Sequence, residues 1–252
     1  LLTESKSLGQ VVISAVAAAA HVIILVFSKD LGSAVIFFAG YLIMVFIATK
    51  NYFYLFAGIL GGAGASIVAY HMFSHVRTRV IAFLHPWSNI NDSGYQITQS
   101  LFAIGTGGWF GLGIDQGDPT SIPYVEQDFI FSAVAEEMGV IFGICLILVC
   151  VSCFIVFMKI AMQLKEDFYR YIAVGISTIY IFQVFLTIGG GTRFIPLTGV
   201  TLPLVSYGGS SVLTTIIMFS IIQGLYCIQS QEGKRNVRKE RRRTADREAG
   251  EE

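Results

Sequence analysis

One carboxylate in this sequence is well placed to act as a general base. Asp128 stands directly before the apolar residues Phe129 to Phe131, within a region from Val80 to Met158 that contains no Lys or Arg. Apolar neighbours desolvate a carboxylate, which raises its pKa and makes it a stronger base. Asp is also a favoured N-cap residue. The residues alone therefore predict either a base or a cap for the helix that follows.

Two further acidic residues are candidates for the same site. Glu136 and Glu137 follow Asp128 by about two helical turns, and adjacent helical residues point about 100° apart, so we expect at most one of them to share its cavity. Acidic side chains near a helix N-terminus also interact favourably with the helix dipole. A purely structural role for Glu136 and Glu137 therefore stays open.

Three arginines could bind an anionic group in this region. The Arg guanidinium matches phosphate oxygens with two parallel hydrogen bonds, which Lys cannot do. The alternative is that these side chains extend to lipid headgroups. The candidates on the side of Asp128 are Arg77, Arg79 and Arg193.

The elements that carry these side chains have the composition of a membrane protein. Hydrophobic residues make up 54% of the chain and charged residues 13%, whereas a soluble domain carries about 25% charged residues. We therefore predict an all-α polytopic membrane protein with about six transmembrane helices, because the apolar runs are long enough to cross a bilayer. These runs are about Leu8 to Phe27, Leu31 to Ala48, Tyr52 to Phe73, Val134 to Met162, Tyr169 to Ile188 and Leu204 to Ile228.

The predicted helices divide the chain into four parts. Three transmembrane helices lie in residues 1–76, a long loop in 77–133, three more helices in 134–230, and a basic tail in 231–252. The tail contains the run KRNVRKERRR, which is typical of a cytoplasmic segment near anionic headgroups, and we expect it to be disordered.

The long loop is expected to lie outside, partly at membrane depth, and to be re-entrant or helical. It lacks Lys and Arg after Arg79, whereas cytoplasmic loops are usually basic, so both termini are predicted to be cytoplasmic. Gln99 to Gly113 is apolar and Gly-rich, which predicts a re-entrant or interfacial segment. Trp87 and Trp109 favour the headgroup level. The four Cys residues fall in apolar runs and predict neither a disulfide nor a metal site.

Four motifs in order resemble the SEDS proteins of shape, elongation, division and sporulation. They are VRTRVIAFLHPW from Val76, GYQITQSLFAIGTGGWFGLG from Gly94, YVEQDFIFSAVAEEMG from Tyr124 and PLTGVTLPLVSYGGSS from Pro196. The resemblance covers about residues 1–230. It implies a ten-span fold, of which this chain would hold the C-terminal six spans, with about four further spans before Leu1.

The resemblance implies a peptidoglycan glycosyltransferase. It would polymerise lipid II into glycan strands at the outer face of the bacterial cytoplasmic membrane, during cell elongation, division or sporulation. Asp128 matches the acidic residue of the family's Asp-Phe-Ile-Phe motif and would be the catalytic base. The candidate substrate-binding residues are Arg77, Arg79, Arg193, Glu136, Glu137 and Ser206; no His or Lys near Ser206 in sequence could activate it as a nucleophile.

The expected partners follow from the same resemblance. They are lipid II, a class B penicillin-binding protein and membrane lipids, and nucleic acid is not among them. No cofactor is implied with certainty, and a divalent cation, Mg or Mn, stays open. Two other functions fit the same residues: a lipid II flippase, or a non-catalytic membrane scaffold for a penicillin-binding protein.

Overall fold

The computed structural model describes the backbone of residues 8–248 and the side chains of residues 9–231. Within this part of the chain every regular element is helical, as predicted. The α-helices are α1 (Leu8–Phe27), α2 (Leu31–Thr49), α3 (Tyr52–Met72), α4 (Ser74–Leu84), α5 (Tyr95–Gly107), α6 (Ile130–Gln163), α7 (Asp167–Gly191) and α8 (Gly209–Glu248), and the short 3₁₀ helices are η1 (Trp87–Asn89) and η2 (Pro119–Ser121).

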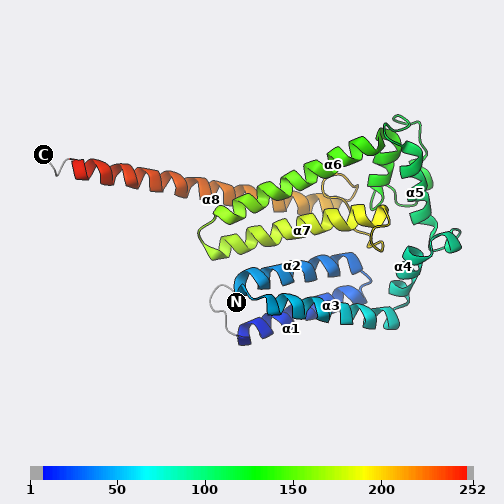
Figure 1. Ribbon diagram of the computed structural model, residues 1–252, viewed down its shortest axis with the longest axis horizontal. Helices are drawn as coiled ribbons and strands as arrows, with labels where there is room; N and C mark the ends of the chain where they lie inside the picture. Colours follow the sequence, from blue (N-terminus) through cyan, green and yellow to red (C-terminus); the bar gives the residue numbers. More distant parts are fainter. Residues whose placement is uncertain (1–7, 249–252) are drawn as a thin grey trace.

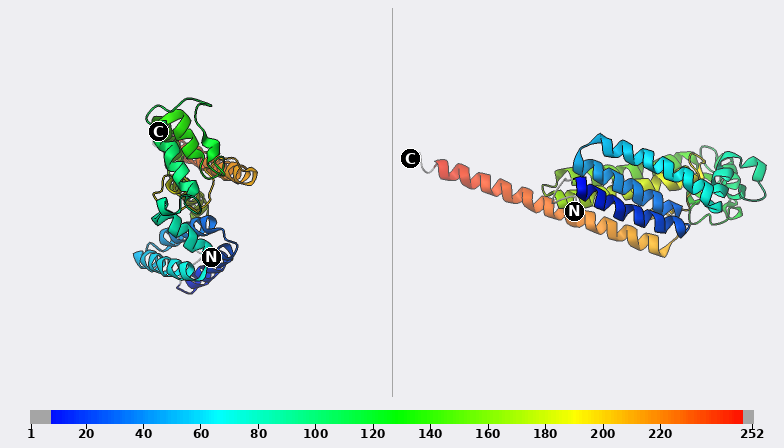
Figure 2. Two further views of the ribbon diagram at one scale, coloured as in Figure 1. Left: turned by 90° about the vertical axis from the view of Figure 1, so that its right-hand side faces the viewer. Right: turned by 90° about the horizontal axis from the view of Figure 1, so that it is seen from below.

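Six of the described helices are long and apolar enough to cross a membrane, which confirms the predicted number. They are α1, α2, α3, α6, α7 and the part of α8 that ends at Gln231. Figure 1 shows these helices lying along one direction, with α1 to α3 on one side and α6 to α8 on the other. Helix α2 contacts α7 and so joins the two groups, which are seen end-on in Figure 2.

Short turns with specific caps connect the first three helices. The Asp30 carboxylate accepts a hydrogen bond of 3.0 Å from the Ser33 backbone N–H and caps α2. Lys50 ends α2 in the left-handed conformation, and the next residue, Asn51, caps α3. Helices joined by such short turns run antiparallel. The cap at Asp30 also places the start of α2 beside the loop after α7, since a Cβ on Gly32 would meet Thr198 O at 3.0 Å.

Helix α6 is broken at Gly139, where φ is 85° and ψ is 166°. The segment 108–114, which we call the strap, crosses α6 at this point. At the break, backbone groups of α6 lose their partners within the helix, and buried backbone groups need hydrogen-bond partners. Backbone groups of the strap take the place of the lost partners. The bonds are Leu112 N to Glu136 O and Gly113 N to Glu137 O, both 2.9 Å, Val140 N to Gly108 O, 3.0 Å, and Ile141 N to Trp109 O, 3.3 Å.

The long outer loop contains helix α5, as the prediction of a re-entrant or helical loop allows, and the strap that follows it is irregular. The structure differs from the predicted elements in three places. The fourth span begins at Ile130 rather than Val134, and the sixth begins at Gly209 because residues 203–206 form a turn and a bend. In residues 231–248, which the sequence predicted to be disordered, the described backbone continues α8. The Lys, Arg, Glu and Ala residues of this segment are good helix formers, and no Pro interrupts them.

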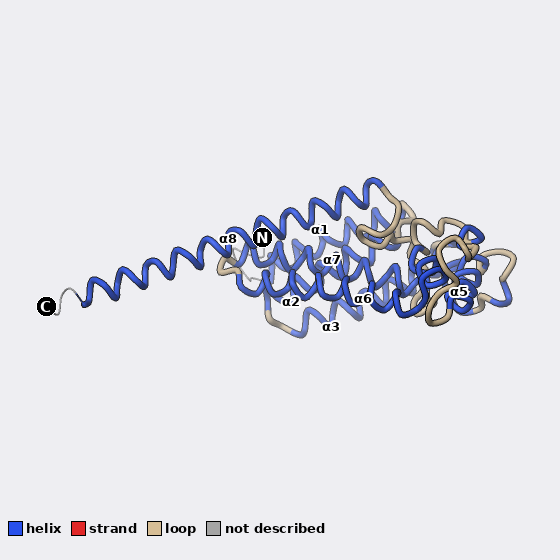
Figure 3. Tube along the Cα trace, turned by 90° about the horizontal axis from the view of Figure 1, so that it is seen from above, coloured by secondary structure: helices blue, strands red, loops and turns tan. Residues whose placement is uncertain are grey.

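The loops and short helices gather at one end of the bundle. Figure 3 shows them around α5, at the end opposite the C-terminus. Buried hydrogen bonds hold this end together: Ser100 Oγ donates to Gly191 O at 2.7 Å and lies 2.5 Å from Ser132 Oγ. These residues belong to α5, α7 and α6, so three helices meet at a fixed point below the loops.

Candidate functional site

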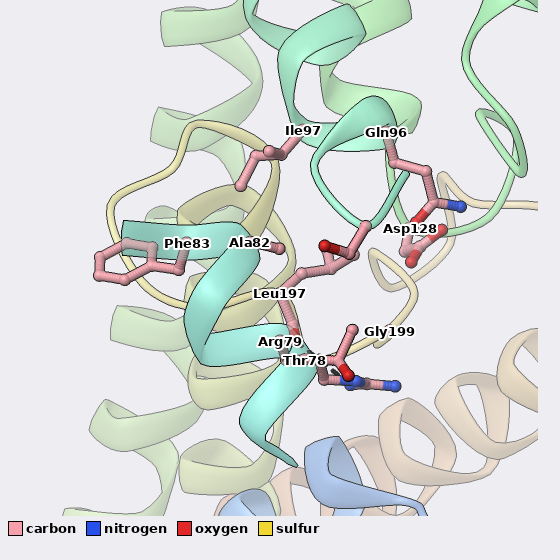
Figure 4. Close-up of a pocket in the computed structure, with 10 residues that line it drawn as sticks. Thr78, Arg79, Ala82, Phe83, Gln96, Ile97, Asp128, Leu197 and Gly199 are labelled. Carbon is pink, nitrogen blue, oxygen red and sulfur yellow. Dashed lines mark hydrogen bonds between the residues drawn. The ribbon is translucent and has the colours of Figure 1, made fainter. Parts of the chain in front are cut away.

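A cavity of about 290 Å³ opens among the loops at this end of the bundle. Segments far apart in the sequence form its walls: α4, the start of α5 with the turn before it, Asp128 just before α6, and the loop after α7. Its lining residues, most of them labelled in Figure 4, are Thr78, Arg79, Ala82, Phe83, Ser93, Gln96, Ile97, Asp128, Leu197 and Gly199.

Asp128 lies in the wall of this cavity and does not cap α6. The N-cap residue of α6 is Phe129, and no side chain forms a cap hydrogen bond there. The Phe129 side chain is fully buried beside it. Burial raises the pKa of the Asp128 carboxyl above its ordinary value, and this outweighs the opposing effects of a backbone hydrogen bond and of the Arg79 charge. The cap alternative is therefore wrong, and Asp128 has the environment of a base.

Arg79 is the cationic group of the cavity. Its Nη1 donates a hydrogen bond of 3.2 Å to Leu197 O, which fixes the guanidinium against the loop after α7. It does not form an ion pair with Asp128; within residues 9–231 the one ion pair joins Arg170 and Asp167 at 2.8 Å. Arg79 therefore keeps donors for a bound anion.

The loop after α7 also holds the backbone that precedes Asp128. Ser206 Oγ donates to Gln127 O and accepts a hydrogen bond of 2.8 Å from Leu202 N. Tyr207 N donates to Glu126 O at 2.7 Å. Ser206 is buried and does not line the cavity. Ser206, predicted as a substrate-binding residue, therefore lies outside the cavity lining and holds the backbone that precedes Asp128.

The other two predicted arginines lie outside the cavity lining. Arg193 Nε donates to Phe83 O at 3.0 Å and its Nη2 to Leu84 O at 3.4 Å, so Arg193 caps the last turn of α4. Arg77 Nη2 donates to His71 O at 3.4 Å, and its guanidinium lies 5.7 Å from the ring centre of Tyr70. Arg77 and Arg79 diverge because they are two positions apart on a helix.

Glu136 and Glu137 also lie outside the cavity lining, whereas the sequence predicted that at most one of them would share the cavity with Asp128. Their carboxylates accept hydrogen bonds of 3.2 Å from Asp118 N and Asp115 N, respectively. They hold the loop that follows the strap. Glu136 is buried and its Oε2 has no partner among the described residues.

The sequence analysis did not select the three uncharged polar residues of the cavity. Thr78, Ser93 and Gln96 add polar groups to the lining, and Gln96 extends toward Asp128 in Figure 4. Gln96 and Ser93 lie in or next to the GYQITQS motif. That motif also contains the polar residues Thr98, Gln99 and Ser100, so residue type alone did not mark Gln96 as a cavity residue.

The cavity does not hold the donors of a protein metal site. Asp128 is the one carboxylate in its lining, and no three His, Cys, Asp or Glu side chains within residues 9–231 lie close enough to hold an ion. Mg²⁺ is usually held by one or two carboxylates together with substrate phosphates rather than by protein ligands alone. Asp128 is the one carboxylate of the lining that such an ion could use.

The site can carry out a specific kind of chemistry. A partly desolvated carboxylate can take a proton from a bound hydroxyl. A guanidinium on the same cavity can stabilise an anionic leaving group. Together these groups suit a transfer reaction between two substrates, one with a hydroxyl and one with a phosphate group.

Comparison with known proteins gives consistent matches along the chain. The family model described as "Cell cycle protein" and named for FtsW, RodA and SpoVE matches residues 3–231. The peptidoglycan glycosyltransferase RodA of Mycobacterium tuberculosis is 39% identical over 200 residues, which cover 79% of this chain and 42% of RodA. Stage V sporulation protein E of Bacillus subtilis is 34% identical over 199 residues, covering 78% of this chain and 54% of that protein.

A probable peptidoglycan glycosyltransferase FtsW of Francisella salina is 39% identical over 210 residues, covering 79% of this chain and 51% of FtsW. The chain thus spans about half the length of the curated relatives it matches. One solved structure, from work on "structural coordination of polymerization and crosslinking by a peptidoglycan synthase complex", has a TM-score of 0.72 at 24% identity, covering 86% of this chain and 61% of that one. It has the same fold. With its family model matched from residue 3 to residue 231, the chain belongs to the SEDS family, the family of FtsW, RodA and SpoVE.

Proposed function

We propose that this protein is a peptidoglycan glycosyltransferase that polymerises lipid II into glycan strands. The observation that carries the proposal is the Asp128 carboxylate, which lies in one cavity with Arg79 but forms no ion pair among the described residues. The names of the relatives RodA and FtsW support the same reaction.

Each group has a role in one transfer step. Asp128 accepts the proton of the acceptor sugar hydroxyl as its oxygen forms a bond to the anomeric carbon of the donor sugar. The bond from that carbon to the lipid diphosphate breaks, and the diphosphate leaves with the electron pair. Arg79 binds the diphosphate through the donors that Leu197 O does not occupy, since a charge-assisted pair is stronger than a neutral hydrogen bond.

The proposal extends to a partner and an orientation. The match to a peptidoglycan synthase complex supports a class B penicillin-binding protein as the crosslinking partner. The basic residues near the inner ends of the helices support cytoplasmic termini and an outward-facing cavity at the plasma membrane.

A purified-protein assay with labelled lipid II tests the reaction. Polymer that lengthens with time and is lost in Asp128→Asn is the expected result. A flippase would move labelled lipid II between leaflets of a vesicle without forming polymer. A scaffold would do neither and would tolerate Asp128→Asn, so each of these results would overturn the proposal.

A further inference from the structure

The strap exposes large apolar side chains on a rigid backbone. Trp109 is 67% exposed, Phe110 84% and Ile114 69%. The backbone beneath the first two is fixed by the hydrogen bonds of the strap to both sides of the α6 break. Exposed apolar patches of this kind mark contact with a membrane or another protein. The site described above does not use them.

The break in α6 lies at the edge of the predicted hydrocarbon layer. Between Glu137 and Lys159, helix α6 has 21 residues without a charge, Met138 to Met158. At 1.5 Å per residue this run is about 32 Å long, close to the hydrocarbon thickness of about 30 Å. Gly139 therefore lies at the level where hydrocarbon meets headgroups, and the strap, bonded to Val140 and Ile141, lies there too.

The exposed surface of α6 continues the patch in the direction of the bilayer. Ile141 and Phe142 are 44% and 43% exposed, and Leu148, further along α6, is 59% exposed. Trp favours the headgroup level because its indole ring is largely apolar but carries a polar N–H. Phe is common with Trp on the buried face of segments that lie in the interface. A lipid surface fits this continuity better than a separate protein partner.

We infer that the strap is an interfacial anchor, with Trp109 and Phe110 inserted among the headgroups and upper acyl chains of the bilayer on the cavity side. The strap is hydrogen-bonded to α6 from Glu136 to Ile141, and Asp128 lies just before the start of the same helix. The anchor therefore sets the height of the cavity above the hydrocarbon layer. The inference goes beyond the proposed activity and does not depend on it.

Tryptophan quenching in nanodiscs tests the anchor. The chain has two Trp residues, so Trp87→Phe leaves Trp109 as the reporter, and Phe preserves a ring on Phe102, whose centre is 5.7 Å from that of Trp87. The full chain is placed in nanodiscs whose lipids carry a nitroxide either near the headgroup or near the acyl chain end. Aqueous iodide is the third quencher.

The expected result is a larger loss of Trp109 emission with the shallow nitroxide than with the deep one, and a small loss with iodide. The matched control replaces both Trp residues with Phe and adds Leu148→Trp, nine residues beyond Gly139 and so about 14 Å deeper; this reporter should respond most to the deep nitroxide.

Strong quenching of Trp109 by iodide, with little loss to either lipid, would overturn the anchor and indicate a surface left in water for a protein. Phe110→Trp, in a chain with Phe at both natural Trp positions, provides a second reporter on the strap. It should give the same order of quenching, and the opposite order would contradict the inference.

Discussion

Arg79 and Asp128 approach each other across Gly199 in the wall of the cavity. A Cβ on Gly199 would lie 3.8 Å from Arg79 Nη2 and 3.9 Å from Asp128 Oδ2. Gly199 has a φ of 74°, a conformation that L side chains rarely adopt. Because Gly199 has no side chain, none lies between the Arg79 guanidinium and the Asp128 carboxylate at this point, and the Arg79 charge acts on Asp128.

The charge of Arg79 should control the protonation of Asp128. Arg79 lowers the pKa of a carboxyl that burial raises, so Arg79→Ala should raise that pKa further. The acid limb of the pH–rate profile should then move to higher pH, because a base acts only when deprotonated. Arg79→Lys should leave the limb near its wild-type position but weaken the apparent affinity for lipid II, since Lys lacks the planar fork. An unmoved acid limb in Arg79→Ala would contradict this coupling.

Asp128→Asn should separate activity from stability. Polymerisation should fall by about 10²-fold or more if Asp128 is the base. The raised pKa of Asp128 means that the folded state disfavours its ionised form. The free energy of unfolding therefore falls as pH rises from the pKa of this group in the unfolded chain to its higher pKa in the folded protein. Asn removes that cost, and thermal unfolding at neutral pH should occur at an equal or higher temperature.

The matched control for Asp128→Asn is Asp92→Asn. Asp92 is an exposed acidic residue at the same end of the molecule and does not line the cavity. It should keep wild-type polymerisation. Comparable losses in both variants would remove the special role of Asp128.

Arg193 should act through helix α4. Arg193→Ala leaves Phe83 O and Leu84 O without their donors, and such a loss typically costs about 1–3 kcal/mol. Thermal unfolding should therefore occur at a lower temperature than in Arg77→Ala, because Arg77 contacts the nearby residues His71 and Tyr70, six and seven positions away. Arg193→Lys should recover part of the stability. Full stability of Arg193→Ala together with a specific loss of lipid II affinity would instead restore Arg193 as a direct ligand.

Ser206→Ala should lower the turnover rate by misplacing Asp128. The change removes the bonds that join Leu202 N and Gln127 O through Ser206 Oγ. We expect a lower kcat with little change in KM, because the cavity lining itself stays intact. Ser210→Ala, at an exposed position nearby, is the control. A Ser206→Ala enzyme that changes only KM would favour a direct substrate contact.

Cysteine labelling of intact cells should report the orientation. Ser93→Cys and Thr120→Cys, on the cavity side, should react with an impermeant thiol reagent, because the loop without Lys and Arg is proposed to face outward. Glu166→Cys, in the turn between α6 and α7, should be protected until the cells are opened. Protection of both outer positions would reverse the orientation.

Sequence composition and the lengths of the apolar runs were sufficient to predict the six membrane-spanning helices. Apolar runs of bilayer length predicted all six spans, because a segment in lipid must satisfy its own backbone hydrogen bonds. The apolar neighbours of Asp128 made it a candidate base or helix cap, and the resemblance of its Asp-Phe-Ile-Phe motif to the SEDS family favoured the base. Arg79 was also selected, but with Arg77 and Arg193 at equal weight, since charge and residue type are the same in all three.

The tertiary structure decided which of these side chains meet. Arg79 joins Asp128 because α4 lies against the loop after α7, 118 residues away in sequence at Leu197. Arg193 is turned to the end of α4, and Glu136 and Glu137 to the loop after the strap. The break at Gly139 depends on backbone partners supplied by residues 108–113. Hydrogen bonds between distant segments set these directions, and local sequence carries no record of which carbonyl a long side chain will reach.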